Sequence, residues 1–271
     1  MNWHETIEYI RQEPSYQQLV EEAYLSANLK SNVESFRNSS EFIATLKLLS
    51  DLNVSKKSSL LDVGAGNGIS SIAFALEGFK VTSLEPDSSD TIGVGAIKKL
   101  KEIYDLPELE IVGSYGENMP FEDNHFDIVY ARQCMHHAYN LPEFAKSIYR
   151  VVKPKGLLLT VRDHVVLNDA DKQAFLKRHP LHKFYEGENA FTLEEYKSAI
   201  KNSGFVIKSI LGPADSVINY SPWSINRVQK IIKQKAGAWA ANIFVSKIAW
   251  MAIKLRLKTV PGRLYTFVSE K

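Results

Sequence analysis

Short apolar runs alternate with amphipathic stretches over the middle of the chain. Runs rich in Val, Ile and Leu predict strands at 59–63, 80–84, 110–113, 126–131 and 156–162. The stretches between them repeat apolar residues at helical spacing and predict helices at 69–77, 91–104 and 142–152. Strands that alternate with helices form parallel crossovers, and strands that are apolar on both faces suit a sheet covered on both sides. The pattern therefore predicts an α/β fold with a doubly wound, mostly parallel sheet.

The first 55 residues carry a helical pattern without strands. Apolar positions recur at helical spacing in three segments, at 6–11, 16–29 and 40–52. We expect residues 1–55 to form an N-terminal helical lid that precedes a single domain over 56–271.

After residue 162 the alternation of strands and helices loosens. The segment 164–191 is polar, aromatic and rich in His, and we expect it to face the substrate. A helix is predicted at 194–203, and strands at 205–211 and 263–271 bring the sheet to seven strands. Two further helices are predicted at 224–235 and 239–258. They interrupt a short strand connection, so we interpret 221–260 as a helical insertion before the last strand.

The charge is distributed unevenly along this chain. The composition, with 45% apolar and 24% charged residues among 271, is that of a globular protein with a net charge of +2. The segment 216–269 has nine Lys and Arg and no Asp or Glu, which leaves 24 basic against 31 acidic residues elsewhere. Together with Trp223, Trp239 and Trp250, this charge favours binding to an anionic membrane surface. A solvated helical face, or a cap or dimer interface with buried tryptophans, is the alternative. Nucleic acid is the least favoured partner because no RNA-binding module is recognisable, and the oligomeric state stays open.

The single cysteine and the start of the chain bear on location. Cys134 has no second cysteine for an intramolecular disulfide, and the first residues lack the basic and apolar regions of a signal peptide. The longest apolar stretch, 236–255, is interrupted by Lys247 and Lys254 and is a weak match to a spanning helix. We therefore expect a cytoplasmic, soluble protein with peripheral membrane association.

A glycine-rich loop gives the sharpest local signal. The sequence LLDVGAGNGISS at 60–71 lies where the first predicted strand runs into a helix, so the glycines let a ligand approach the backbone near free N–H groups. A dinucleotide site favours G-x-G-x-x-G, but Ile69 stands at the sixth position. Glu85 ends the second strand about 20 residues later, where a carboxylate can bind ribose hydroxyls. Asp62 lies in the strand beside the loop.

Further motifs follow the loop in order. They read VTSLEPD at 81–87, GENMPFEDNHFDIVYARQCMHH at 116–137 and RVVKPKGLLLTV at 150–161. Over about residues 40–163, and again in the last strand, the chain resembles the class I S-adenosylmethionine-dependent methyltransferases of the small-molecule type. The resemblance implies a Rossmann-like methyltransferase fold, S-adenosylmethionine as cofactor and S-adenosylhomocysteine as product.

The resemblance also implies where the cofactor lies. The glycine loop would line its methionine and ribose, Asp62 would lie near its amino group, Glu85 would hold the ribose and Pro86 would border the adenine. Ser-Tyr-Gly at 114–116 replaces the Gly-Asp-Ala of many relatives, so Tyr115, Glu117 or backbone groups would meet the adenine. The predicted cofactor-binding residues are Asp62, Gly64, Ala65, Gly66, Gly68, Glu85, Pro86, Gly116, Glu117 and Arg132.

Methyl transfer needs an aligned nucleophile and an acceptor for its proton, and the candidates lie beyond the fourth and fifth strands. Histidine has a suitable pKa. In the family that the chain resembles, the residue matching His137 commonly faces the cofactor pocket, so His137 is the first candidate base, followed by His164 and His136. For His137 and His164, a loop histidine bonded to backbone is the alternative. The predicted substrate-binding residues are His179, His182, Tyr185 and Asn189.

A metal site is not predicted. Gln133, His136 and His137 match a metal-binding Glu-x-x-Glu-His run of quinone O-methyltransferases, but the loss of both carboxylates disfavours a hard cation such as magnesium. His179 and His182 have no third ligand at suitable spacing.

The sequence thus predicts a methyltransferase that acts on the oxygen of a small or lipid-linked hydroxylated acceptor, such as a glycan, a lipid or a natural product. Two alternatives remain open: a noncatalytic protein that binds S-adenosylmethionine or regulates a partner, and a Rossmann-type oxidoreductase.

Overall fold

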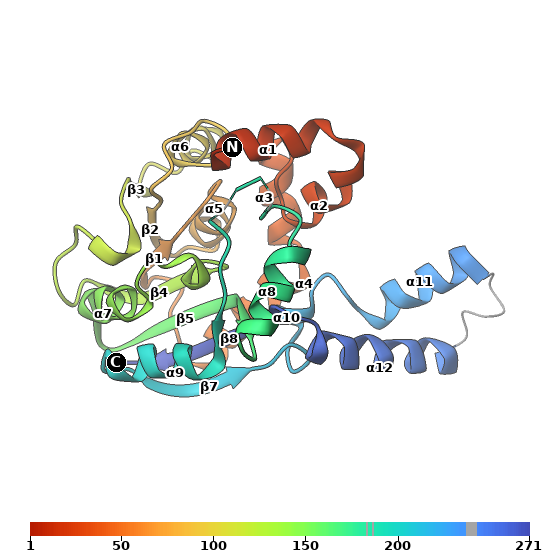
Figure 1. Ribbon diagram of the computed structural model, residues 1–271. Helices are drawn as coiled ribbons and strands as arrows, with labels where there is room; N and C mark the ends of the chain where they lie inside the picture. The colour runs from red at the N-terminus through yellow and green to blue at the C-terminus, as the bar shows by residue number, and fades with distance from the viewer. Residues whose placement is uncertain (183, 186, 237–242) are drawn as a thin grey trace.

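A computed structural model describes all residues except 183, 186 and 237–242. One eight-stranded sheet has the order β3-β2-β1-β4-β5-β8-β7, and β6 pairs with β5 off this path (Figure 1). The strands are β1 Ser59–Val63, β2 Lys80–Leu84, β3 Glu110–Val112, β4 Phe126–Arg132, β5 Val152–Val166, β6 Phe191–Thr192, β7 Val206–Leu211 and β8 Arg263–Glu270. The helices are α1 Trp3–Gln12, α2 Gln17–Glu22, α3 Leu29–Arg37, α4 Ser40–Asp51, α5 Ile69–Leu76, α6 Val94–Ile103, α7 Leu141–Val151, α8 Asp169–Arg178, α9 Leu193–Asn202, α10 Val217–Tyr220, α11 Ile225–Ala236 and α12 Ile243–Thr259.

The sheet confirms the predicted doubly wound α/β fold. Strands β1 to β5 pair in parallel, whereas β8 runs antiparallel between β5 and β7. The seven predicted strands make up the continuous path, and the two-residue β6 is an addition. The first five strands therefore end at one edge of the sheet, where parallel α/β folds place ligands.

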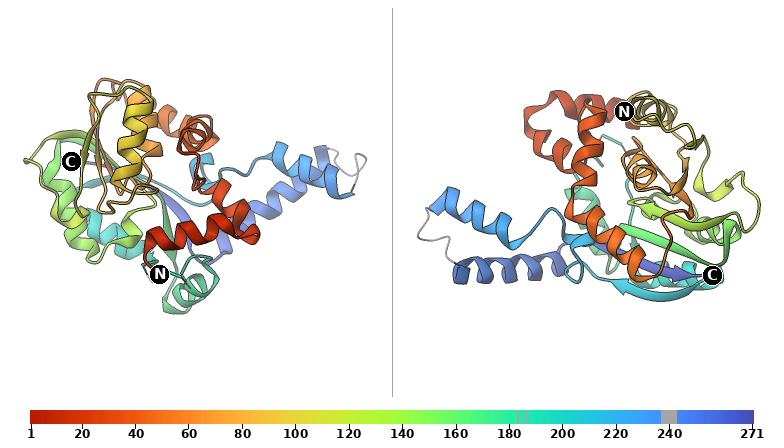
Figure 2. Two further views of the ribbon diagram at one scale, coloured as in Figure 1. Left: turned by 90° about the horizontal axis from the view of Figure 1, so that it is seen from above. Right: turned by 180° about the vertical axis from the view of Figure 1, so that it is seen from behind.

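Apolar side chains cover both faces of the sheet, as the apolar runs require (Figures 1 and 2). On one face, Phe144 and Ile148 of α7 pack with Tyr196 of α9. On the other face, Phe42 of α4 and Phe74 of α5 pack among other aromatic rings, with ring centroids 5.0 Å apart.

The prediction of one continuous helix at 16–29 is wrong. Helix α2 ends at Glu22, and Tyr24 adopts a left-handed conformation with φ of 58°, which breaks the helix. The Asn28 side chain then accepts a hydrogen bond from the Ser31 amide and starts α3, which the hydrophobic pattern did not predict. The N-terminal residues are helical, but in shorter pieces.

The strand β5 is longer than expected and carries a bulge. Its pairing with β8 shifts register between Thr160 and Asp163, where Arg162 has a φ of 61°. A bulge re-aims the side chains on either side of it. Here Arg162 donates to the carbonyl oxygen of Ile218 at 2.8 Å, while Asp163 is fully buried.

Helices α11 and α12 form a hairpin that extends beyond the body of the molecule (Figures 1 and 2). The expected start of the second helix, and Trp239, lie outside the described residues. None of the helices in the described ranges reaches the length and apolarity needed to span a bilayer.

Candidate functional site

A cavity of about 860 Å³ lies at the carboxyl ends of β1, β2, β4 and β5. Its wall includes the glycine loop and Glu85 on one side and the turn after β4 on the other. Residues of α1 and of the segment 179–188 complete it, and these two elements touch, with the rings of Trp3 and Tyr185 5.3 Å apart. The lid and substrate-facing roles predicted for 1–55 and 164–191 remain predictions.

The glycine loop is held in left-handed backbone conformations. The φ angles of Gly64, Gly66 and Gly68 are 66°, 56° and 83°, which residues with a Cβ rarely adopt. A Cβ at Gly64 would collide with Cys134 Sγ, whereas a Cβ at Gly66 would meet nothing within 4 Å. Open space therefore lies next to the Gly66 backbone, on the cavity wall.

Glu85 ties this loop to the end of β2. Its carboxylate accepts hydrogen bonds from the amides of Gly66 at 2.7 Å and Asp87 at 2.9 Å. The residue is 7% exposed, and burial raises the pKa of Glu85 to about 7.

Asp62 lies behind the loop and does not itself line the cavity. Its Oδ2 accepts from the hydroxyls of Ser70 and Ser71, both at 2.6 Å, while its buried Oδ1 has no hydrogen-bond partner among the described residues. Burial raises the pKa of Asp62 to about 6.

Three elements meet at His136. Its Nδ1 lies 3.0 Å from Asp163 Oδ1, and its backbone amide donates to the same oxygen at 3.2 Å. Its Nε2 lies 4.0 Å from Glu188 Oε2. All three residues are buried, and burial lowers the pKa of His136 and raises the pKa of Asp163 to about 7. With Nδ1–H bound to the carboxylate, the lone pair of Nε2 is directed at the Glu188 side of the cavity.

The other two candidate bases are bonded to backbone carbonyls. His137 Nδ1 lies 2.9 Å from Gly187 O, and His164 Nδ1 lies 2.7 Å from Gly262 O. Both contacts make Nδ1 the donor and leave Nε2 as an acceptor. Burial lowers the pKa of His164 to about 3, and its ring centroid lies 4.8 Å from that of His136.

Arg132 forms an ion pair with Glu41, which the sequence did not predict. Its guanidinium binds the Glu41 carboxylate through Nε at 2.5 Å and Nη2 at 3.1 Å, and stacks over Phe36 at 5.2 Å. Glu41 is 2% exposed; burial alone would raise its pKa, but the guanidinium groups of Arg132 and Arg162 hold the pKa below its ordinary value. Arg132 lines the cavity, so its predicted cofactor role remains a prediction.

The cavity brings most of the predicted site residues together. The predicted residues that line it are Gly64, Ala65, Gly66, Glu85, Pro86, Gly116, Glu117, Arg132, His136, His137, His164, His179 and Tyr185. Four predicted residues do not line it: Asp62, Gly68, His182 and Asn189. Asp163 and Glu188 were not among the predicted site residues. Asp163 follows the fifth predicted strand, beyond which the catalytic candidates were expected, and Glu188 is one of the hydrogen-bonding residues of the segment expected to face the substrate. Neither signal paired these residues with His136.

Comparisons with known proteins show what this chain is similar to. Residues 61–160 match a family model described as a methyltransferase domain. The chain is 32% identical over 123 residues to sterol 4-C-methyltransferase strm-1 of Caenorhabditis elegans, covering 45% of this chain and 35% of that protein. It is 24% identical over 196 residues to a ubiquinone biosynthesis O-methyltransferase of Rickettsia bellii, covering 64% and 78%. Residues 61–160 therefore form a domain similar to the class I S-adenosylmethionine-dependent methyltransferases.

Structural similarity agrees with the fold of this domain. The solved structure of geranyl diphosphate methyltransferase with S-adenosylmethionine superposes with a TM-score of 0.59 at 13% identity, covering 100% of this chain and 95% of that one. The chain spans between 35% and 42% of the length of the first curated relatives.

The glycine loop fits S-adenosylmethionine, the cofactor of the methyltransferase domains to which residues 61–160 are similar. Open space beside Gly66 admits a ligand against the backbone, and the Glu85 carboxylate is in place for ribose hydroxyls. Asp62 Oδ1, which has no hydrogen-bond partner in the part of the chain that the structure describes, is a buried acceptor behind the loop.

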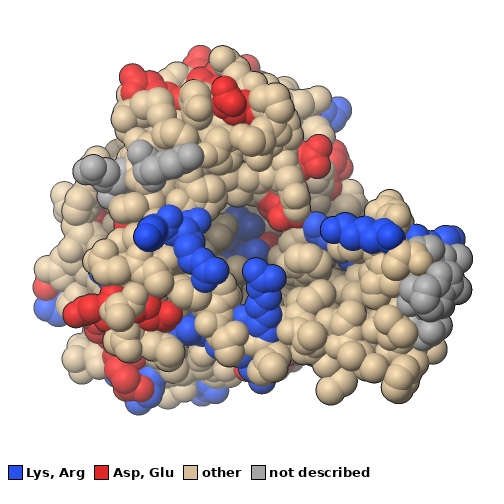
Figure 3. Space-filling view, turned by 45° about the vertical axis from the view of Figure 1, so that its right-hand side comes forward, with Lys and Arg blue, Asp and Glu red and all other residues tan. Residues whose placement is uncertain are grey.

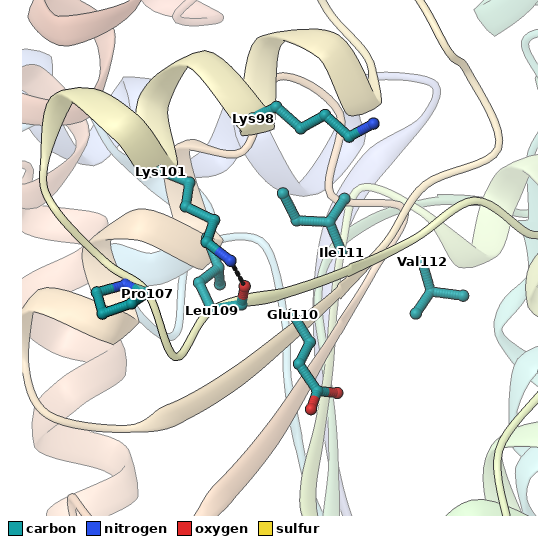
Figure 4. Close-up of a pocket in the computed structure, with 7 residues that line it drawn as sticks. All are labelled: Lys98, Lys101, Pro107, Leu109, Glu110, Ile111 and Val112. Atoms are coloured by element: carbon teal, nitrogen blue, oxygen red, sulfur yellow. Dashed lines mark hydrogen bonds between the residues drawn. The ribbon is translucent and has the colours of Figure 1, made fainter.

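A second depression of about 470 Å³ lies along β3 at the edge of the sheet (Figure 4). Figure 4 shows Lys101 of α6 donating to the carbonyl oxygen of Leu109 at 2.8 Å. This depression brings together none of the predicted site residues.

Proposed function

We propose that this methyltransferase moves the methyl group of S-adenosylmethionine to a hydroxyl oxygen of a small or lipid-linked acceptor. The observation that carries the proposal is the His136–Asp163 pair, which shares one cavity with the glycine loop and Glu85. When bound, S-adenosylmethionine supplies a methyl group on a sulfonium sulfur, which keeps the electron pair as the sulfur–methyl bond breaks.

In this proposal His136 is the base. Its Nε2 takes the hydroxyl proton as the oxygen–methyl bond forms, since Nδ1 is occupied by Asp163. Asp163, at 3.0 Å, and Glu188, at 4.0 Å, stabilise the imidazolium that results. The order of candidates thus changes, with His136 ahead of His137 and His164.

Cofactor binding and turnover test the proposal separately. Calorimetric titration with S-adenosylmethionine and S-adenosylhomocysteine is expected to show binding that Gly66→Val and Glu85→Ala abolish. Release of S-adenosylhomocysteine over a panel of hydroxylated acceptors is expected to fall about 10²–10⁴-fold in His136→Gln, the range of general-base catalysis. A smaller loss in His136→Gln than in His137→Gln or His164→Gln would reassign the base. Cofactor binding without turnover on any acceptor would favour the noncatalytic alternative. Tight binding of a nicotinamide cofactor would favour the oxidoreductase alternative.

The hairpin of α11 and α12 supports a lipid-linked acceptor at an anionic membrane surface. Phe244, Ile248, Met251 and Leu255 of α12 recur four, three and four residues apart, so they share one helix face. They are 70%, 52%, 70% and 65% exposed, a large apolar stripe for a soluble protein.

Basic residues accompany this stripe. Figure 3 shows Lys and Arg along one edge of the projecting hairpin, next to a broad surface without charged side chains. Both tryptophans in the described part of this segment contact cations, with Lys254 5.4 Å from the ring centre of Trp250 and Arg227 5.0 Å from that of Trp223. Exposed apolar residues between basic ones match the chemistry of an anionic lipid surface.

Vesicle co-sedimentation tests the membrane proposal. We expect binding to vesicles of phosphatidylcholine with phosphatidylglycerol, weaker binding to phosphatidylcholine alone, and loss of binding in Phe244→Glu combined with Met251→Glu. Ile103→Glu is the matched control, since Ile103 on α6 is 53% exposed and lies outside the hairpin. Equal binding to both vesicle types, or no effect of the double substitution, would refute it.

A further inference from the structure

Three side chains on two separate segments direct metal-ligating atoms at one point. One ligand atom from each of His136, His137 and Glu188 lies within 4.8 Å of the other two. Both histidines follow β4, whereas Glu188 comes from the segment after α8. The fold, not local spacing, brings them together.

The hydrogen bonds around the cluster prepare both imidazoles as ligands. The Nδ1 of His136 is bound to Asp163, and the Nδ1 of His137 is bound to the carbonyl oxygen of Gly187. A histidine that ligates a metal through one nitrogen almost always donates its other N–H to a carboxylate or a backbone carbonyl. Here each of the two ligand histidines has such a partner, and each Nε2 lone pair is left for an ion.

A further donor lies beside the cluster. His179 Nδ1 is 3.7 Å from Glu188 Oε1 and has no hydrogen-bond partner among the described residues. His179 lines the same cavity. An imidazole nitrogen beside the Glu188 carboxylate supplies a fourth donor or orients that carboxylate.

We propose that His136, His137 and Glu188 bind a divalent transition metal ion of the zinc type. Two imidazoles and a carboxylate, with further positions left for water or substrate, form the donor set of catalytic zinc sites. Imidazole donors also favour zinc, iron, cobalt or nickel over magnesium, which prefers oxygen ligands.

The ligand atoms must move closer together on loading. Two ligands that each lie about 2.0 Å from a tetrahedral zinc ion are about 3.3 Å apart, whereas His136 Nε2 and Glu188 Oε2 are 4.0 Å apart, and the three ligand atoms lie within 4.8 Å of one another. The side chains of Glu188 and His137 would have to rotate to close these gaps, while the contact with Asp163 holds His136.

This inference revises the sequence-based expectation of no metal. That expectation considered Gln133 with the two histidines, but the third ligand comes from Glu188, 52 positions after His136. The ion would bind the same Nε2 of His136 that the proposed base uses, so metal binding and base catalysis by His136 exclude each other. Metal binding itself does not rest on the proposed function.

Metal titration tests the site without any acceptor. Protein stripped with a chelator is titrated with Zn²⁺ by calorimetry and with Co²⁺ by visible absorption, in which cobalt with four ligands absorbs far more strongly than hexa-aqua cobalt. We expect one equivalent bound, and at least a tenfold loss of affinity in His136→Gln and in Glu188→Gln. Asp163→Asn keeps all three ligands and is expected to weaken binding by about 10–100-fold.

His4→Gln is the matched control. His4 lines the same cavity but bonds Thr91 Oγ1 at 2.6 Å and is not in the cluster, so its loss should leave metal affinity unchanged. Melting temperatures show whether each variant folds. If the His136 variant does not fold, the metal affinity of Glu188→Gln decides the test, because Glu188 lies outside the helices and strands. Equal affinity in wild type and Glu188→Gln, or no stoichiometric binding, would overturn the inference. Calorimetry with S-adenosylmethionine on the stripped protein separates a failure of the metal site from a failure of the proposed function. Cofactor binding without metal binding would overturn this inference alone.

Discussion

Glu85→Gln should stabilise the fold at alkaline pH and weaken cofactor binding at the same time. Burial raises the pKa of Glu85 from 4.5 to about 7. An acid whose pKa is higher in the folded than in the unfolded state stabilises the fold most below its unfolded pKa. That contribution is lost as the pH rises through about 7.

The size of the effect follows from the shift. At 1.36 kcal/mol per pKa unit, and with part of the titration already complete at pH 5, wild type should lose about 2–3 kcal/mol more stability than Glu85→Gln between pH 5 and pH 8. The amide also loses hydrogen bonds to Gly66 or Asp87, but that cost is the same at both pH values and cancels in the difference. Asp62 and Asp163 titrate in both proteins and cancel as well.

Urea unfolding followed by tryptophan fluorescence at pH 5 and pH 8 measures this difference. Glu122→Gln, at an exposed position, is the control. In the same variant, loss of a hydrogen bond to a charged group should weaken S-adenosylmethionine binding at pH 8 by about 1.5–3 kcal/mol, more than tenfold. Parallel pH profiles for wild type and Glu85→Gln would show that burial does not raise this pKa, and the reasoning would fail.

Four single substitutions and one double substitution test the surrounding packing by urea unfolding. Gly64→Ala should cost about 2–4 kcal/mol, from a left-handed conformation and a clash beside β4, whereas Gly66→Ala should cost only about 1–2 kcal/mol and mainly weaken cofactor binding. Similar losses in both would contradict this. Arg132→Ala should cost about 3–5 kcal/mol because it leaves Glu41 buried without its bidentate partner, and adding Glu41→Ala should recover part of the loss. Asn219→Ala removes a buried amide that bonds the end of β7 and a β8 hydroxyl, and should cost about 2–4 kcal/mol; a loss below 1 kcal/mol would refute that role.

The local sequence determined where the central strands and the glycine loop of this protein lie along the chain. The bounds of β1 and β2 match the predicted runs, because strands buried on both faces are rich in apolar residues. The glycine loop and Glu85 could also be identified in advance, since a strand, a tight turn and a helix follow one another within a few residues. The helices from 16 to 37 could not, because a left-handed Tyr24 and an Asn28 cap overrode a continuous helical pattern.

Only the tertiary structure decided the chemistry of the site. Asp163 meets His136 because a bulge in β5 changes which way successive side chains point, and that shift depends on pairing with β8, about 100 residues away. Glu188 reaches the same point from a separate segment of the chain, in which Tyr185 contacts Trp3 of α1. Side-chain direction at such positions depends on long-range pairing and packing, which no local pattern encodes; local propensity selects the elements, and their packing selects which polar groups meet.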